Sequence, residues 1–204
     1  MKYVTCVYED VLTFSVMKKL IVNFVGKIEI TKSINAHGFG AIKRDILKYN
    51  QAAKINPFFI ITDLDQKKCP VELIKEWFKD NTVSENMIFR IAVHEIDSWI
   101  LADKIGIANC LDVSEVLIPQ KPDEISDPKQ FLMNLAKKSK NSDIKNNFPP
   151  KDNFAKQGPL YNPILCSFVE YEWNVEEAVK KSESLKRAVK ALEGFSEKKE
   201  KKNE

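Results

Sequence analysis

Strand-like and helix-like stretches alternate four times along residues 1–106, and this alternation restricts the possible folds more than any other feature of the sequence. The strand-like stretches are 1–8, 27–34, 57–65 and 86–95, and the helix-like stretches are 11–25, 41–54, 71–80 and 96–106. Such alternation is typical of an α/β domain with a mostly parallel sheet. The third and fourth strand-like stretches are almost continuously apolar, which is expected of strands that are covered on both faces.

The second half of the chain has a different pattern, with helical stretches and polar loops. We predict an α/β core over residues 1–106, whose last helix ends at Gly106, and a helical subdomain or lid over residues 107–195. Residues 196–204 form a charged tail without enough apolar side chains to join a core.

Composition excludes several classes of protein. The 204 residues carry 32 basic and 29 acidic side chains, so the small net charge of +3 says little about partners. Glu9 and Asp10 interrupt the first apolar stretch, and no segment approaches the roughly 18 apolar residues of a membrane span. The cysteines are far apart, which argues against zinc, against a disulfide framework and for a cytoplasmic location; they are Cys6, Cys69, Cys110 and Cys166.

Acidic residues follow three of the predicted strands. Glu9 follows the first, Asp63 and Asp65 follow the third, and Glu95 follows the fourth. Because the carboxyl ends of parallel strands meet at one edge of a sheet, we expect these carboxylates to converge there. In an extended chain Asp63 and Asp65 would point to the same side, with Leu64 directed into apolar packing. Carboxylates held together favour a hard cation, Mg²⁺ or Mn²⁺.

Alternative interpretations remain for these acids. Aspartates after strands often cap the next helix, and Asp10 stands where such a cap is expected. Asp97 could supply a carboxylate for a second metal ion or around the first. Trp99 is expected in the core, whereas Asp103, on the same predicted helical face as Glu95, is expected to be a surface acid.

Several motifs in a fixed order resemble the Toprim domain of topoisomerases, primases and OLD-family nucleases. They span residues 3–195 and read VYED, HGFGAIK, TDLD, VHEIDSWILAD, DPK and GPLYN. More closely, they look like a small bacterial Toprim-like family of unknown function related to RloB-like and OLD-family proteins. This resemblance implies a four-stranded sheet flanked by helices, with a C-terminal helical subdomain. It also implies a magnesium-dependent nuclease associated with phage defence and an ATPase partner.

The resemblance also implies roles for individual residues. Asp63 and Asp65 would hold the metal ion, Glu9 would be the general acid/base or a further ligand, and Glu95 would be the additional acid of the nuclease branch. Toprim sequences usually have glycine after the first glutamate, whereas this chain has Asp10.

A nuclease also needs cations, because phosphate contacts dominate affinity for nucleic acid. The best candidates are Lys43, Arg44, Lys151 and Lys156. Of these, Lys156 precedes GPLYN and is the predicted electrostatic stabiliser of the reaction. Tyr161 and Asn162 of that motif could help to shape the pocket.

Three functions remain open at this point. The first is a metal-dependent nuclease that hydrolyses phosphodiester bonds of DNA or RNA. The second is a Toprim-like module that binds a nucleotide, a nucleic acid or an ATPase without cutting, which the replacement of glycine by Asp10 favours. The third is a phosphatase for a small molecule, since the same acids would suit that chemistry.

Overall fold

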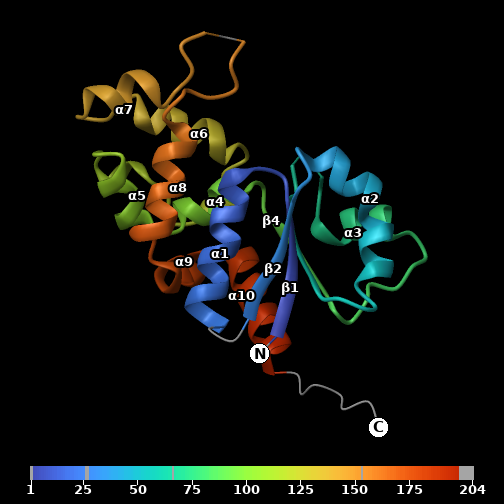
Figure 1. The fold of residues 1–204 in the computed structure, drawn as a ribbon. Coiled ribbons are helices and arrows are strands. Elements are labelled where there is room, and N and C mark those ends of the chain that lie inside the picture. The colour runs from blue at the N-terminus through green and yellow to red at the C-terminus, as the bar shows by residue number, and fades with distance from the viewer. Residues whose placement is uncertain (1, 26–27, 66, 153, 198–204) are drawn as a thin grey trace.

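The computed structural model describes residues 2–25, 28–65, 67–152 and 154–197 (Figure 1). Within these residues four strands form one sheet in the order β2-β1-β3-β4, and every neighbouring pair is parallel. The strands are β1 (Lys2–Tyr8), β2 (Ile28–Asn35), β3 (Phe58–Asp63) and β4 (Met87–Ala92). The predicted α/β class is thus confirmed, and most of the predicted charged tail, residues 198–204, lies outside the described residues.

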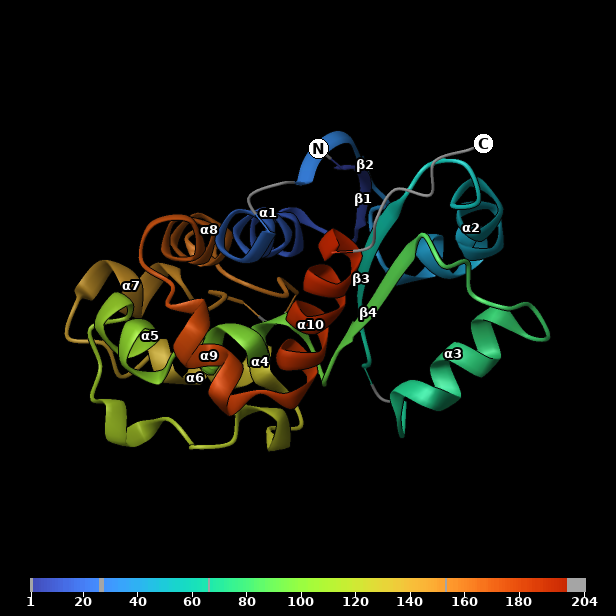
Figure 2. The same ribbon diagram turned by 90° about the horizontal axis from the view of Figure 1, so that it is seen from below.

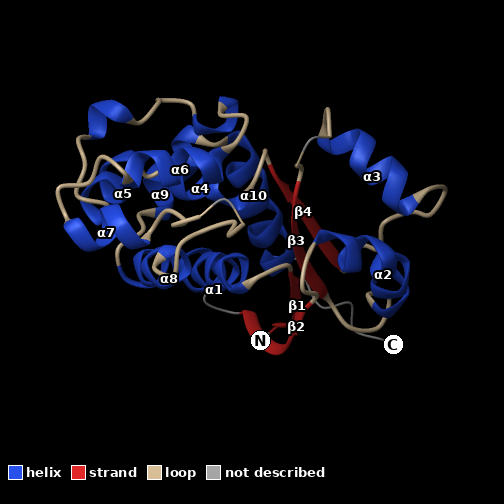
Figure 3. Cartoon of the chain, turned by 90° about the horizontal axis from the view of Figure 1, so that it is seen from above, coloured by secondary structure: helices blue, strands red, loops and turns tan. Residues whose placement is uncertain are grey.

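Helices cover both faces of the sheet (Figures 2 and 3). Helix α1 (Val11–Val25) and helix α10 (Glu183–Glu197) lie on one face, and α2 (Phe39–Ala52) and α3 (Pro70–Phe78) lie on the other. Side chains of β3 alternate between two apolar clusters: Phe59 and Ile61 belong to the larger cluster, whereas Phe58 and Ile60 belong to the smaller one. Burial on both faces explains why this strand is continuously apolar.

The remaining helices extend the layer that contains α1. They are α4 (Ile96–Leu101), α5 (Lys104–Cys110), α6 (Pro128–Ala136), α7 (Ser142–Asn147), α8 (Tyr161–Tyr171) and α9 (Val175–Lys181), with 3₁₀ turns at Glu115–Leu117 and Pro122–Glu124. Helix α8 packs against α1, α10 packs against β4, and α4 packs against α6. The larger apolar cluster continues from the sheet into these helices. It therefore crosses the boundary predicted at residue 106, and the division into two parts remains a prediction.

The segment 96–106 differs from the sequence-based expectation. Helix α4 ends at Leu101, and Gly106 lies inside α5 instead of ending the preceding helix. Asp103 is only 5% exposed, and its carboxylate accepts hydrogen bonds from the N–H groups of Gly106 (3.0 Å) and Asn174 (2.8 Å). The predictions of a helix end at Gly106 and of a surface Asp103 are therefore wrong. The acid interrupts the helix because it caps α5 and fixes the start of α9.

None of the described helices is long and apolar enough to cross a membrane.

Candidate active site

The acids predicted at the strand ends lie at the carboxyl ends of three adjacent strands, the end of the sheet that Figure 3 faces. Glu9 follows β1, Asp63 is the last residue of β3, and Glu95 follows β4 as the N-cap of α4. All three side chains are partly buried. Burial raises the pKa of Asp63 well above its ordinary value, and the negative charges of Glu9, Asp97 and Glu95 raise it further. The structure thus brings these residues together as the sequence predicts.

Glu9 is held against β3 by its carboxylate. Its Oε1 accepts hydrogen bonds from the Thr62 hydroxyl (2.5 Å) and from the N–H of Asp63 (3.2 Å). Burial nevertheless raises the pKa of Glu9, because it outweighs these two hydrogen bonds, and the charges of Asp65 and Asp10 act in the same direction. Asp10 caps α1 as expected, since its Oδ1 accepts from the N–H of Thr13 at 2.9 Å. The bonds to β3 and the cap on α1 orient Glu9 from both sides.

Asp63 links β3 to the start of α4. Its Oδ1 accepts a hydrogen bond from the N–H of Ile96, the first residue of α4, at 2.8 Å. This bond favours the ionised carboxyl, but burial and the neighbouring acids raise the pKa more than the bond lowers it. Asp63 therefore accepts one backbone hydrogen bond and is surrounded by negatively charged side chains.

The segment after β3 turns sooner than predicted. Leu64 is 2% exposed, which confirms it as the apolar anchor, and its N–H donates to the carbonyl groups of Ala92 and His94. Asp65 has a φ of 50° and is exposed, so the expected extended chain from Asp63 through Asp65 is wrong. The chain turns here because the carbonyl groups at the end of β4 accept hydrogen bonds from the N–H groups of both Leu64 and Asp65. The charge of Asp65 still raises the pKa of Glu9 and Glu95.

Asp97 is the most enclosed acid of the site. It is 4% exposed, and its Oδ1 accepts a hydrogen bond from the hydroxyl of Tyr161, which is itself 1% exposed. Burial raises the pKa of Asp97 from 3.8 to about 7; the Tyr161 hydrogen bond opposes this rise and the charge of Glu95 adds to it. Tyr161, predicted to shape the pocket, thus contacts an acid predicted to act with the metal.

Lys129 is a residue of this site that sequence reasoning missed. Its N–H donates to Glu95 Oε2 at 3.0 Å, and its ammonium lies over the Tyr161 ring, 4.9 Å from the centroid. Its positive charge lowers the pKa of both Glu95 and Asp97. The available signal was the DPK motif, in which Asp127 caps α6 and Pro128 begins it, so that the next residue lies on the first turn of the helix.

In the described part of the chain, none of the residues predicted to contact nucleic acid makes a hydrogen bond or ion pair with the acids of the site. Lys43 pairs with Glu76 (2.6 Å), which also pairs with Lys67, and Arg44 pairs with Asp45 (2.7 Å). Lys151 and Lys156 are exposed in the loop between α7 and α8. Among the described residues, no hydrogen bond or ion pair joins Lys156 to the acids of the site. Lys129 instead contacts Glu95 through its backbone N–H, and its charge lowers the pKa of Glu95 and Asp97.

The chemistry of the donors fits a hard divalent cation. Glu9, Asp63, Asp65, Glu95 and Asp97 offer carboxylate oxygen only, which Mg²⁺ and Mn²⁺ prefer. Several of these carboxyls have raised pKa values, so that a cation would relieve their mutual repulsion. Across the described ranges, however, no three His, Cys, Asp or Glu side chains are already arranged around one point as metal ligands. Glu9 Oε1 and Asp63 Oδ1 accept hydrogen bonds within the protein.

No protein-family model, curated protein or solved structure matches the chain significantly.

Proposed function

We propose that the chain is a metal-dependent nuclease of the Toprim type, which hydrolyses phosphodiester bonds of DNA or RNA. The observation that carries this proposal is the cluster formed by Glu9, Asp63, Glu95 and Asp97 at the ends of adjacent strands, in which burial and nearby negative charges raise the pKa of every carboxyl. Acids that serve only the fold are seldom buried together without cations, because their burial and repulsion destabilise the folded state. Such arrangements are concentrated at functional sites.

Asp63 and Asp65 would hold the ion, as the Toprim resemblance implies, and Glu9 would be the general acid/base beside it or a further ligand. The negative charges of Glu95 and Asp97 act on Asp63. A bound Mg²⁺ or Mn²⁺ supplies charge neutralisation at the phosphoryl oxygens and makes a bound water more acidic. Asp63 Oδ1 accepts the hydrogen bond from the N–H of Ile96, which leaves the second carboxylate oxygen to ligate the ion.

The protein residues have distinct roles in this proposal. Glu9, whose pKa burial raises and which is held at the end of β1 by Thr62, accepts a proton from the attacking water. The water oxygen then bonds to phosphorus while the bond from phosphorus to the leaving oxygen breaks, and that oxygen takes up a proton from solvent. The ammonium of Lys129, placed over Tyr161, stabilises negative charge on the phosphoryl group. Lys129 therefore takes the role that the sequence suggested for Lys156.

Cleavage of labelled single-stranded and duplex DNA and RNA tests the proposal, with Mg²⁺, with Mn²⁺ and with EDTA. We expect hydrolysis only with a metal, and a loss of at least about 100-fold in Asp63→Asn, because removing a ligand costs more than the 10- to 100-fold loss typical of residues around a ligand. Asparagine keeps an oxygen for the Ile96 N–H, so the fold should be retained. Asp80→Asn, which changes an exposed aspartate after α3, is the matched control.

Equal cleavage by wild type and Asp63→Asn, or no metal-dependent cleavage of any substrate, would reject the nuclease. Because the sequence resemblance includes proteins that act with an ATPase, the assay is repeated with any ATPase that co-purifies with the chain, with and without ATP.

A second candidate is a Toprim-like module that binds a metal or nucleotide without hydrolysis. The observation that favours it is that Glu9 and Asp63 make hydrogen bonds within the protein, while Asp10, in the place of the usual glycine, caps α1. Calorimetric titration with Mn²⁺ separates the two. Binding that depends on Asp63 without cleavage supports the module, whereas binding together with cleavage supports the nuclease.

A further inference from the structure

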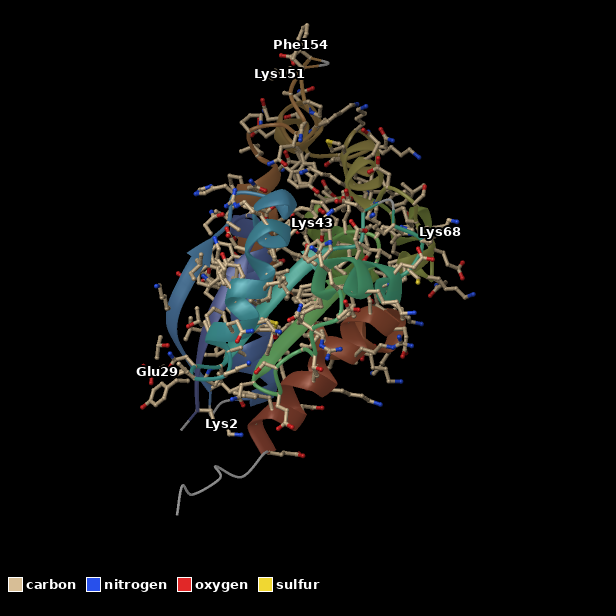
Figure 4. All side chains as sticks on the ribbon, turned by 90° about the vertical axis from the view of Figure 1, so that its right-hand side faces the viewer. Lys2, Glu29, Lys43, Lys68, Lys151 and Phe154 are labelled. Atoms are coloured by element: carbon tan, nitrogen blue, oxygen red, sulfur yellow. The ribbon has the colours of Figure 1, made fainter. Side chains whose placement is uncertain are left out.

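The loop between α7 and α8 presents an unusually exposed aromatic side chain. Phe154 is 97% exposed, more than any other large apolar residue of the described ranges. Figure 4 places Phe154 and Lys151 at one extremity of the molecule, opposite Lys2 and Glu29 near the beginnings of β1 and β2. The loop therefore projects beyond the end of the molecule at which the strands terminate and the acids gather.

Local hydrogen bonds define the shape of this loop. At the tip, Asp152 Oδ1 accepts from the N–H groups of Phe154 and Ala155, both at 2.9 Å. At the base, the N–H of Gly158 donates to the carbonyl of Phe148 at 3.0 Å. A Cβ on Gly158 would lie 2.2 Å from the Asn147 carbonyl oxygen, so only glycine fits there. Hydrogen bonds to Asp152 thus hold the backbone N–H groups of Phe154 and Ala155.

The base of the loop is packed against the candidate active site. Phe148 is fully buried, and its ring centroid lies 4.8 Å from that of Tyr161. Tyr161 in turn donates its hydroxyl hydrogen bond to Asp97. A ligand held at the loop tip would thus be attached to the same packed unit that positions the acids of the site.

The chain segment that leads up to and includes Phe154 is basic. Residues 137–156 contain six lysines and two aspartates, and one aspartate, Asp152, is engaged by the backbone of the loop. In the described part of the chain none of these lysines makes an ion pair; they are Lys137, Lys138, Lys140, Lys145, Lys151 and Lys156. An exposed aromatic ring in one loop with Lys151 and Lys156 matches single-stranded nucleic acid, whose bases stack on aromatic side chains while its phosphates contact ammonium groups.

We propose that Phe154, flanked by Lys151 and Lys156, stacks on an unpaired base and makes single-stranded nucleic acid the preferred ligand. This inference depends on the proposed function in that it takes nucleic acid as the substrate. In a duplex each base is already stacked on its neighbours and paired, so the ring gains no contact with it. Charge complementarity favours this ligand over a protein partner, since an apolar pocket would receive Phe154 but would leave the lysines without a role.

Fluorescence anisotropy with short labelled oligonucleotides, in EDTA so that nothing is cleaved, tests this proposal. Wild type should bind single strands more tightly than a blunt duplex of the same length. Phe154→Ala should weaken single-strand binding roughly 5- to 150-fold, the range for one stacked base, and leave duplex binding nearly unchanged. Phe154→Trp should retain binding, with quenched tryptophan emission on stacking. Tyr171→Ala, which removes another exposed aromatic ring at the end of α8, is the matched control.

The lysines are tested separately. Lys151→Gln combined with Lys156→Gln should flatten the dependence of log affinity on log salt by about 0.7 for each phosphate contact that is lost. No binding by wild type, unchanged single-strand binding by Phe154→Ala, or equal losses on single strands and duplex would each overturn the proposal.

The two proposals fail in different ways. Binding is measured in EDTA and needs no metal, whereas cleavage does. Binding that depends on Phe154 without any cleavage would reject the nuclease chemistry alone. If the Phe154→Ala variant cleaves with the wild-type rate and binds with the wild-type affinity, the stacking role alone is rejected.

Discussion

Asp97 and Asp103 are two aspartates with almost equal burial, 4% and 5% exposed, on neighbouring helices of one segment. Asp103 accepts two backbone hydrogen bonds, from Gly106 and Asn174, which replace the water it loses. Asp97 accepts one hydrogen bond, from Tyr161, and experiences the negative charge of Glu95. The Asp103 carboxylate holds two helices in place, whereas the Asp97 carboxylate is kept in an environment that disfavours its charge.

This difference shows that burial of an acid does not by itself identify a functional site. In the candidate active site, by contrast, a buried carboxylate has fewer hydrogen-bond donors and more neighbouring acids than Asp103 has. Asp63 repeats the pattern of Asp97, with one backbone donor and three acids that raise its pKa. Isosteric replacement of aspartate by asparagine should therefore have opposite effects at the two kinds of position.

The largest expected effect is a gain of stability in Asp97→Asn without metal. The pKa of Asp97 is raised from 3.8 to about 7, so the folded protein keeps a proton that the unfolded chain loses above pH 3.8. The contribution of this group to stability is therefore highest below about pH 4, falls as the pH rises, and levels off above about pH 7. One pKa unit corresponds to about 1.4 kcal/mol, which gives a total on the order of 4 kcal/mol. Asparagine cannot ionise and keeps an oxygen for the Tyr161 hydroxyl.

Denaturant unfolding of wild type and Asp97→Asn in EDTA, between about pH 4 and pH 8, measures this effect. The variant should be the more stable protein at about pH 8, and its stability should change less with pH. A variant that is less stable than wild type at about pH 8 would show that Asp97 is a structural acid like Asp103.

The opposite sign is expected for Asp103→Asn. An amide has one acceptor oxygen, so either the Gly106 or the Asn174 N–H must face an NH₂ group and lose its partner. We expect a loss of roughly 1–3 kcal/mol in the free energy of unfolding, the cost of an unsatisfied buried donor. The same unfolding experiment at about pH 8 measures it, with Asp97→Asn as its counterpart. Equal stabilities of Asp103→Asn and wild type would contradict the importance of the two backbone bonds.

The parts of the molecule that sequence could predict are those governed by local patterns. The apolar stretch Phe58–Ile61 indicated a strand covered on both faces, and the acids after β1, β3 and β4 indicated the end of the sheet at which a site would form. Asp10 as the cap of α1 and Leu64 as an apolar anchor follow from equally short patterns.

The parts that sequence could not predict depend on contacts between distant segments. Asp103 resembles a surface acid until the N–H of Asn174 approaches it from α9. Likewise, Lys129 is one of many lysines, and only the packing of α6 beside α4 brings it to Glu95 and Tyr161. Asp65 leaves the extended conformation because the end of β4 supplies acceptors for its N–H and that of Leu64. No spacing rule within one segment contains this information.

The smallest of the three stability effects is expected for Lys129→Met, which tests the cation at the border of the acidic cluster. The charge of Lys129 lowers the pKa of Glu95 and Asp97, so its removal should raise both pKa values further. The metal-free variant should therefore be less stable than wild type at about pH 8 by about 1 kcal/mol or less, because a partly exposed charge is screened by water, and should match wild type at about pH 4. The control variant is Lys43→Met. It removes one of the two lysines that pair with the exposed Glu76 and leaves the other, Lys67, in place. A loss for Lys129→Met that is the same at both pH values would assign it to packing against Tyr161 and not to charge.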